Sequence, residues 1–400
     1  MPQHYSTQDF FRRAPNSLLA RYFQTQELFL DLDITALKET KPDKLLDHWF
    51  DLPTAQRNTM ETLFRQIFDM SCRNGLTAII DEAEFYLGKD SEEHKRFTSN
   101  LAELPNHFHR SLTVFLDHTE YWQGATRLYH ADTLSYWRKR HHLGHQTAAV
   151  DDASLEQLAT KISDYFHYHE GRGQNCQVEP YRRGELDYFF AYPEDHSQHS
   201  LEWVNGEFAN RPHNPAFEVV FVYSQKDGSL DLNYRGSYKT IIPLQTLFAN
   251  TILKLDELPP DPKDGRVYDL NPLREKGFQF IYPPDSKIES VTVKKLRLSS
   301  RKTQGERITL ETNQTDQPDA TYQLQEKIEQ SYPLNLYSVT QVKINAILKM
   351  ETDKAPKAVT FQLTHPNSCT LKYETHDLIL REMLADSGIE LKEPPEGLDA

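Results

Sequence analysis

Residues 54–73, TAQRNTMETLFRQIFDMSCR, contain the clearest helical pattern in the chain. Pro53 precedes this segment and Gly75 follows it, and these residue types are typical of helix starts and ends. We therefore expect a helix with its apolar side buried, including Phe64, and with Glu61 on the solvent side. The apolar or small side chains recur every three or four residues, as one side of a helix requires: Met60, Leu63, Phe64, Ile67, Phe68 and Ser71.

Weaker helical patterns surround this segment. Together they predict that the chain up to about residue 172 is a domain of packed helices. The segments with a helical pattern are 108–121, 133–142 and 154–168.

The pattern changes at residues 171–175, GRGQN, where two glycines and polar neighbours indicate a loop. Apolar residues then tend to alternate with polar ones, which is typical of strands. Asp227-Gly228 is a favoured tight-turn pair and lies between two such runs, so it predicts a β-hairpin. The strands that we expect are 217–224, 229–234, 290–298, 307–311 and 339–349, with a further alternation at Val359, Phe361 and Leu363; short helices are expected at 241–253 and 375–386.

These patterns predict an α+β protein with several domains. Residues 258–265, LPPDPKDG, contain three prolines and three charged side chains, which favour a solvent-exposed linker. The expected organisation is a helical domain at 1–172, an α+β domain with the hairpin at 173–257, the linker at 258–265, a strand-rich α+β domain at 266–391 and a flexible tail at 392–400.

Composition excludes some classes of protein. The 400 residues carry a net charge of −14, which argues against a chain whose whole surface coats nucleic acid or anionic membrane. Three widely separated cysteines form no CxxC pair and no disulfide framework. The first residues show no secretory signal, and no run approaches ~18 apolar residues. We expect a cytoplasmic protein that is not inserted in a membrane; the sequence leaves its oligomeric state open.

Motifs for catalysis are weak or absent. Residues 76–83, LTAIIDEA, resemble the strand that holds Mg²⁺ in nucleotide hydrolases, but no GxxxxGK[S/T] phosphate loop accompanies them. The more economical interpretation is a helix that buries Ile79 and Ile80 and exposes its acidic residues, Asp81, Glu82 and Glu84. GxSxG and GxGxxG are also missing, so a serine hydrolase or a dinucleotide site is unsupported.

Seventeen histidines raise the possibility of a metal site. His141 and His145 would share a helix face, and His167 and His169 lie beside Glu170, but HExxH is absent and no third ligand follows from the spacing. Exposed histidines at helix ends are the expected alternative. We expect no bound metal and no cofactor.

Two stretches are basic against the acidic background. Residues 133–150 contain no acid, and residues 287–307 contain seven basic side chains and two acidic ones. Such stretches could neutralise phosphates while neighbouring aromatic rings stack bases, although a solvated helix end and a charged edge strand would explain them as well. The candidate nucleic-acid-binding residues are Tyr136, Trp137, Arg138, Lys139, Arg140, Lys294, Lys295, Arg297, Arg301 and Lys302.

Residues 181–203 are rich in aromatic side chains and could line a groove for a partner, since Tyr, Trp and Arg are enriched at interface hot spots. An aromatic core would explain the same residues. The candidate partner-binding residues are Arg182, Arg183, Tyr188 and Trp203.

The sequence therefore favours a non-enzymatic interaction or regulatory protein that binds a macromolecule, either a protein partner or a nucleic acid. A metal-dependent hydrolase or nuclease that uses the scattered histidines and acids is the alternative. No catalytic residue can be assigned.

Overall fold

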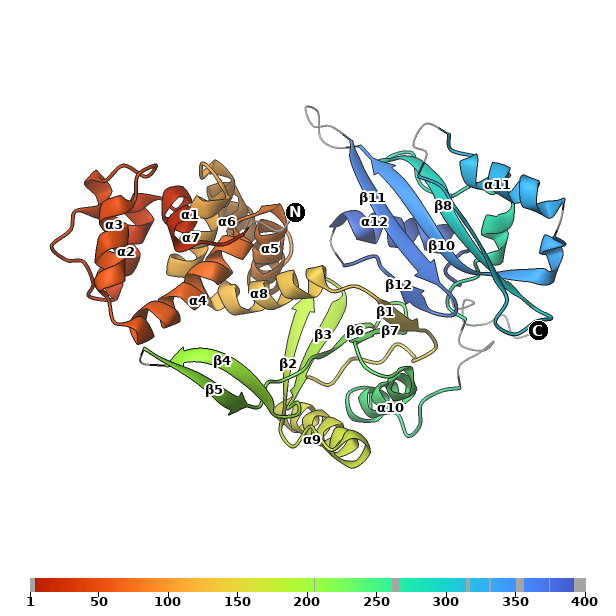
Figure 1. Ribbon diagram of the computed structural model, residues 1–400, viewed down its shortest axis with the longest axis horizontal. Coiled ribbons are helices and arrows are strands. Elements are labelled where there is room, and N and C mark those ends of the chain that lie inside the picture. Colours follow the sequence, from red (N-terminus) through yellow and green to blue (C-terminus); the bar gives the residue numbers. More distant parts are fainter. Residues whose placement is uncertain are drawn as a thin grey trace. The chain divides into compact units, whose positions relative to one another are not determined.

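The computed structural model describes residues 4–204, 206–260, 266–313, 317–330, 332–349, 356–373 and 375–391. The fold is α+β, as predicted, with helices in the N-terminal region and strands in most of the remainder (Figure 1). The chain forms two compact units. The helical unit comprises Met1–Ala131, Tyr181–Gly184 and Gln198–His213; the sheet unit comprises Asp132–Pro180, Glu185–Ser197 and Asn214–Ala400.

The helical unit is built around an aromatic core. Phe64 of α4 is fully buried and lies against the rings of Phe10, Trp49 and Tyr22. The predicted helix is therefore confirmed over residues 54–70, with its apolar side inward. It ends before the predicted residue 73, because Ser71 leaves the helical conformation and the next helix begins at Arg73. The helices are α1 (Thr7–Arg13), α2 (Asn16–Thr25), α3 (Asp43–Asp51), α4 (Thr54–Met70), α5 (Arg73–Leu87), α6 (Glu92–Glu103), α7 (His107–Asp117) and α8 (Thr119–Thr133), with a short 3-10 turn, η1 (Ile34–Ala36).

Local signals start several of these helices. The side chains of Ser91 and Asn106 accept hydrogen bonds from the backbone N–H groups of His94 and His109 and so cap α6 and α7. The single helix predicted at 108–121 is wrong, because the backbone of His118 leaves the helical conformation and separates α7 from α8.

The sheet unit contains a sheet of ten strands. β1 pairs antiparallel with β7 on one side and with β12 on the other, so it joins a central group of strands to a C-terminal group. Both predicted strand-rich ranges, 173–257 and 266–391, contribute to this one sheet. In spatial order the strands are β2 (Cys176–Arg183), β3 (Leu186–Pro193), β6 (Val219–Ser224), β7 (Ser229–Tyr234), β1 (Trp137–Arg140), β12 (Ser368–Cys369), β11 (Lys357–Thr364), β10 (Tyr337–Leu348), β8 (Ile288–Ser300) and β9 (Arg307–Glu311).

The helix predicted at 133–142 is wrong: its second half forms β1. Tyr136 and His142, on either side of this strand, both have positive φ values, which interrupt a helix. Pairing with two neighbouring strands satisfies the backbone of β1, and this long-range gain outweighs the local helical pattern.

The described part of the sheet unit also contains α-helices: α9 (Asp152–Glu170), α10 (Ile241–Thr251), α11 (Ala320–Glu329) and α12 (Thr375–Asp386). Side chains of α9 and α10 pack with the central strands in one hydrophobic core, and those of α12 pack with the C-terminal strands in another. The predicted hairpin, β6–β7, and the predicted alternation in β10 are confirmed. Short 3-10 turns are η2 (Tyr238–Thr240), η4 (Asn271–Arg274) and η5 (Leu334–Leu336).

A separate two-stranded hairpin consists of β4 (Gln198–Val204) and β5 (Glu207–His213). The expected division into three domains stays a prediction. Residues 261–265 of the expected linker and the expected tail at 392–400 lie outside the described residues. Among the helices that the structure describes, none has the length and apolar character needed to cross a membrane.

Candidate functional site

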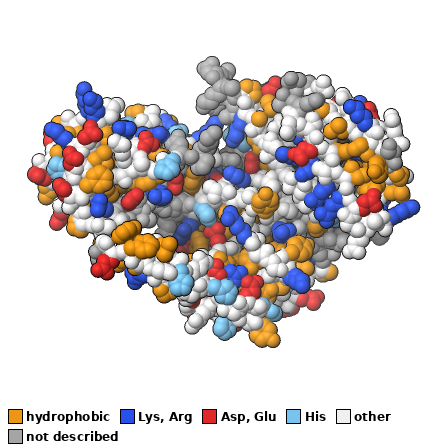
Figure 2. Space-filling view, in the orientation of Figure 1, with side chains coloured by type: hydrophobic (Ala, Val, Ile, Leu, Met, Phe, Trp, Pro, Cys, Tyr) orange, Lys and Arg blue, Asp and Glu red, His pale blue; other side chains and the backbone are white. Residues whose placement is uncertain are grey.

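The strands β8, β9 and β10 bring basic side chains together on one face of the sheet. In the register of the sheet, Lys295 of β8 is paired with Lys343 of β10 and with Glu311 of β9. Ser299 of β8 is paired with Arg307 of β9. Because side chains alternate along a strand, Arg297 points to the same side as Lys295 and Ser299, and so do the residues paired with them. The alternate residues, Leu296 and Leu298 among them, are buried in the core on the opposite side. We call the side that carries Lys295, Arg297, Arg307 and Lys343 the basic face. Figure 2 shows Lys and Arg side chains gathered in the region of these strands.

One carboxylate only partly neutralises the basic face. Glu311 lies 3.0 Å from the Lys343 ammonium and 3.9 Å from that of Lys295. Arg297 instead donates from Nε to the hydroxyl of Thr340 at 3.3 Å, and burial together with the neighbouring Arg307 guanidinium lowers its pKa. Arginine remains charged despite such a shift, so two like charges face each other here.

The other predicted residues of this stretch lie nearby. Lys294 is at a bulge between β8 and β10, where the register shifts. Arg301 and Lys302 are exposed in the turn after β8, and Arg301 donates to the hydroxyl of Ser338. β8 is not an edge strand, because it lies between β10 and β9.

The first predicted basic stretch is not a continuous surface. Trp137 and Arg140 are buried and Lys139 is largely covered, with 11% of its side chain exposed, because β1 lies inside the sheet. Tyr136 is exposed, and the Arg138 guanidinium lies 5.0 Å from the centre of the Tyr238 ring. Any contact with nucleic acid through this stretch would have to use Tyr136 and Arg138.

The predicted partner-binding residues also separate. Tyr188 is fully buried in the sheet, and Arg183 is buried against Asp81, to which its Nε donates at 2.6 Å. Arg182 is half-buried beside Gly184. Trp203 of β4 is 73% exposed, so it is a surface residue.

Trp203 belongs to an apolar patch on the β4–β5 hairpin. It pairs across the strands with Phe208, and the two rings lie 5.5 Å apart. Leu201, two residues before Trp203, points to the same side and is exposed as well. Figure 2 shows this hydrophobic surface over the hairpin.

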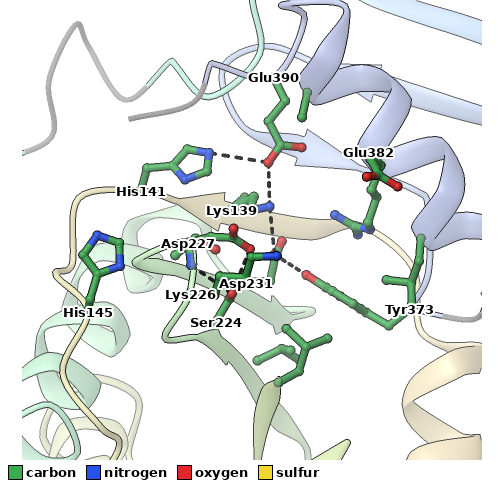
Figure 3. A pocket seen from close by; sticks show the side chains of 16 residues that line it. Lys139, His141, His145, Ser224, Lys226, Asp227, Asp231, Tyr373, Glu382 and Glu390 are labelled. Atoms are coloured by element: carbon green, nitrogen blue, oxygen red, sulfur yellow. Dashed lines mark hydrogen bonds and ion pairs between the residues drawn. The ribbon is translucent and has the colours of Figure 1, made fainter. Parts of the chain in front are cut away.

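A pocket of about 640 Å³ lies within the sheet unit and contains a cluster of buried charges (Figure 3). Lys139 of β1 is paired in register with Asp231 of β7, so the two side chains leave the sheet on the same side. The Lys139 ammonium donates to Glu390 at 2.6 Å and lies 4.0 Å from Asp231. Glu390 follows α12. Its backbone N–H donates a hydrogen bond to the carbonyl oxygen of Leu384, which fixes the position of Glu390 beside the helix.

Three further side chains complete this cluster. The hydroxyl of Tyr373 donates to Asp231, and His141 lies 3.5 Å from Glu390. Arg381 of α12 donates to the backbone oxygens of Leu371 and Lys372, and its guanidinium lies 4.3 Å from the centre of the Tyr373 ring.

The cluster shifts the pKa of its members. Burial alone would lower the pKa of Lys139, but the carboxylates of Glu390 and Asp231 outweigh it and raise that pKa. Burial alone would raise the pKa of Glu390, but Lys139 and His141 outweigh it, so this pKa falls well below its usual range. Lys139 and Glu390 therefore form a charged pair at neutral pH.

Sequence reasoning missed this pocket. The sequence places Lys139 in a candidate nucleic-acid-binding stretch and Asp231 in a strand of the predicted hairpin. The one local signal is in β7, where Ser229, Asp231 and Asn233 alternate with apolar residues: all six residues of that strand are buried, so its polar side is covered too.

The predicted exposure of the histidines is right for some of them and wrong for others. His167 and His169 are exposed at the end of α9, as expected, but His141 is buried and lines the pocket rather than a helix end. His145 lines the pocket too. Among the described residues, no group of three or more His, Cys, Asp or Glu side chains is arranged to hold a metal.

The segment that resembles a magnesium-binding strand is helix α5, as expected. Ile79 is fully buried and Ile80 is half-buried. Glu82 was expected to face water; it is buried instead, because α5 packs in the helical core on that side as well.

The chain matches no protein-family model, no curated protein and no solved structure.

Proposed function

We propose that this protein binds nucleic acid through its phosphates, on the basic face of β8, β9 and β10. The observation that supports this most is the gathering of Lys295, Arg297, Arg307 and Lys343 on one side of the sheet, where Glu311 is the one acid that the register of the described strands pairs with them. Four positive charges minus one leave a local charge of +3, in a chain whose net charge is −14.

The geometry suits phosphates better than bases. Neighbouring strands are ~4.8 Å apart, so the four cations on three strands form a patch roughly 10 Å wide. The side chains paired with them on this face are polar and not aromatic, for example Thr309 and Gln341. Hydroxyls, amides and cations bind phosphate oxygens without distinguishing sequence, so we expect binding that is largely independent of sequence.

The test is a fluorescence anisotropy titration of labelled DNA and RNA, single-stranded and duplex, at ~50 mM salt. Oligonucleotides of about 20 nucleotides exceed the ~4–16 that a small domain covers. We expect saturable binding that the double substitution Arg297→Ala, Arg307→Ala weakens at least ~10-fold, because two charge-assisted contacts are lost.

The matched control is Arg138→Ala, which removes a surface arginine from the other basic stretch of the same unit. It should leave the affinity nearly unchanged. Absence of saturable binding by the wild type would overturn the proposal, and a loss with Arg138→Ala alone would move the site to the first stretch.

A second candidate, a contact with a protein partner, is supported by the exposed hairpin patch of Leu201, Trp203 and Phe208. Aromatic residues in such a patch are typical interface anchors. A photo-crosslinking residue in place of Trp203 should capture a defined protein in cells, and Phe208→Ser should reduce the capture. The same crosslinker at Tyr168, which is exposed on α9, is the control; equal capture from both positions would argue against the patch.

A further inference from the structure

Several buried polar atoms in the wall of the pocket of Lys139, Asp231 and Glu390 make no hydrogen bond. Oδ1 of Asp231, Oε2 of Glu390 and Nη1 of Arg381 have no hydrogen-bond partner among the residues that the structure describes. All three side chains are more than nine-tenths buried, and all three line the pocket. An unsatisfied buried polar atom costs stability, and an ionised group costs more, so a ligand that satisfies these atoms is favoured.

The unused atoms define a complementary molecule. Two carboxylate oxygens require hydrogen-bond donors, and one guanidinium N–H requires an acceptor. Both carboxylates already lie within 4.0 Å of the same Lys139 nitrogen, so a single small donor group can reach the same region. The strongest matches are ionised ones: an ammonium for the carboxylates and a carboxylate for the guanidinium.

The charge of the cluster also restricts the ligand. Among the residues that line the pocket, three carry a positive charge and four a negative one: Lys139, Lys226 and Arg381 against Asp227, Asp231, Glu382 and Glu390. A dianion such as phosphate would be placed beside two carboxylates, and a polyamine beside two cations. A ligand without net charge avoids both repulsions.

We propose that this pocket binds a small zwitterion of the amino-acid type, with its ammonium group held by Asp231 and Glu390 and its carboxylate held by Arg381. The volume of about 640 Å³ is within the range of ~300–1,000 Å³ of small-molecule sites.

Helix α12 provides the wall that would contact the remainder of the ligand. Leu378, Arg381, Glu382 and Ala385 recur every three or four residues, so one side of the helix lines the pocket. The other side, with Leu380 and Met383, packs in the core. Leu378 and Ala385 form an apolar surface beside the charged cluster, which suits an aliphatic side chain.

The experiment uses the full chain and the free amino acids, each at up to ~10 mM, with thermal unfolding and isothermal titration calorimetry. At least one amino acid should bind saturably and raise the unfolding temperature by about 2 °C or more, since a ligand that binds only the folded state stabilises it. Propylamine, acetate, glucose and inorganic phosphate are the matched probes that each lack part of the zwitterion, and each should bind at least ~10-fold more weakly.

Leu378→Trp is the decisive variant. It places a large ring at the mouth of the pocket, where Leu378 is partly exposed, and leaves the charged cluster intact. It should abolish amino-acid binding without lowering the unfolding temperature of the unliganded chain. Ile242→Trp, at an exposed position on α10, is the control and should bind normally.

Three results would overturn the proposal: no amino acid binds at ~10 mM, one of the four probes binds as tightly as the best amino acid, or Leu378→Trp binds normally. If Leu378→Trp also destabilises the chain, Glu382→Trp replaces it, because Glu382 is exposed, lines the pocket from the same side of α12 and lies outside the buried pair of Lys139 and Glu390. Normal binding by Glu382→Trp would then contradict the proposal.

Discussion

The helical unit and the sheet unit bury charged side chains in opposite ways. In the helical unit, Glu82 of α5 is buried without a cation; its Oε2 has no partner among the described residues, and burial raises its pKa to about 7. It lies so close to α8 that a side chain at Gly124 would collide with it. In the sheet unit, Glu390 is buried beside Lys139, and its pKa is lowered.

The difference shows that burial alone does not set the state of a carboxyl group. Without a cation Glu82 gains a proton near neutral pH, whereas the Lys139 ammonium keeps Glu390 ionised. A neutral buried acid has no charge that a ligand must compensate. An ionised cluster with unused oxygen and nitrogen atoms can bind one, which is why the pocket of the sheet unit is the better candidate for a small-molecule site.

The largest expected effect follows from breaking the buried pair. Lys139→Met leaves Glu390 and Asp231 without their shared cation, and breaking a buried pair from one side costs about 3–5 kcal/mol. Urea unfolding should show this loss. Adding Glu390→Gln should recover part of it, because the uncompensated charge is removed. If Lys139→Met unfolds like the wild type, the cluster is not a tightly paired network.

A loss of similar size is expected in the helical unit from packing alone. Phe64→Ala removes a fully buried ring from the aromatic core and should destabilise the chain by about 3–5 kcal/mol. Glu61→Ala on the same helix is the control and should cost little. Equal effects of the two substitutions in urea unfolding would show that the orientation of α4 is wrong.

A smaller effect, with a distinct pH dependence, is expected from Glu82. Its pKa is about 7 when folded and near 4.5 when unfolded, so the folded chain binds more protons between these values. Stability should therefore fall as the pH rises through this window. Glu82→Gln should remove that slope and stabilise the chain at pH ~8 by about 2–3 kcal/mol.

The matched control for this experiment is Glu103→Gln, at an exposed position at the end of α6. It should leave the pH slope of the wild type in place. A Glu82→Gln protein that keeps this slope would show that Glu82 is not the titrating group. Glu390 should act in the opposite direction, since its lowered pKa adds stability above about pH 4.5 that is lost only as the pH falls below that value.

The smallest effect on stability is expected at the basic face. Arg297→Ala with Arg307→Ala removes two like charges from the surface, so the free energy of unfolding should change by about 0.5 kcal/mol or less. Urea unfolding checks this. A large loss would mean that these arginines are structural, and the binding defect expected of this variant could then not be assigned to lost phosphate contacts.

Patterns of neighbouring residues predicted those helices and strands whose formation depends on residues close together in the chain. The apolar spacing around Phe64, the Asp227-Gly228 turn and the alternation of β10 all correspond to observed elements. They succeed because each signal lies within one helix or one pair of neighbouring strands.

The candidate pocket could not be predicted in this way. Lys139 and Glu390 are 251 positions apart, and β1 becomes a strand only because β7 and β12 pair with it. No spacing within the sequence indicates such a contact. The same pairing leaves only 11% of the Lys139 side chain exposed, although the local composition predicts a surface cation.

The salt dependence of nucleic-acid binding tests the proposed function most directly. If four cations each neutralise one phosphate, log K for single strands should fall with log salt at a slope of about −3, since each contact contributes ~0.7. The Arg297→Ala, Arg307→Ala protein should show a slope nearer −1.5, and Arg138→Ala should retain that of the wild type. Binding with the same slope in all three proteins, or no binding at ~50 mM salt, would contradict a phosphate site on the basic face.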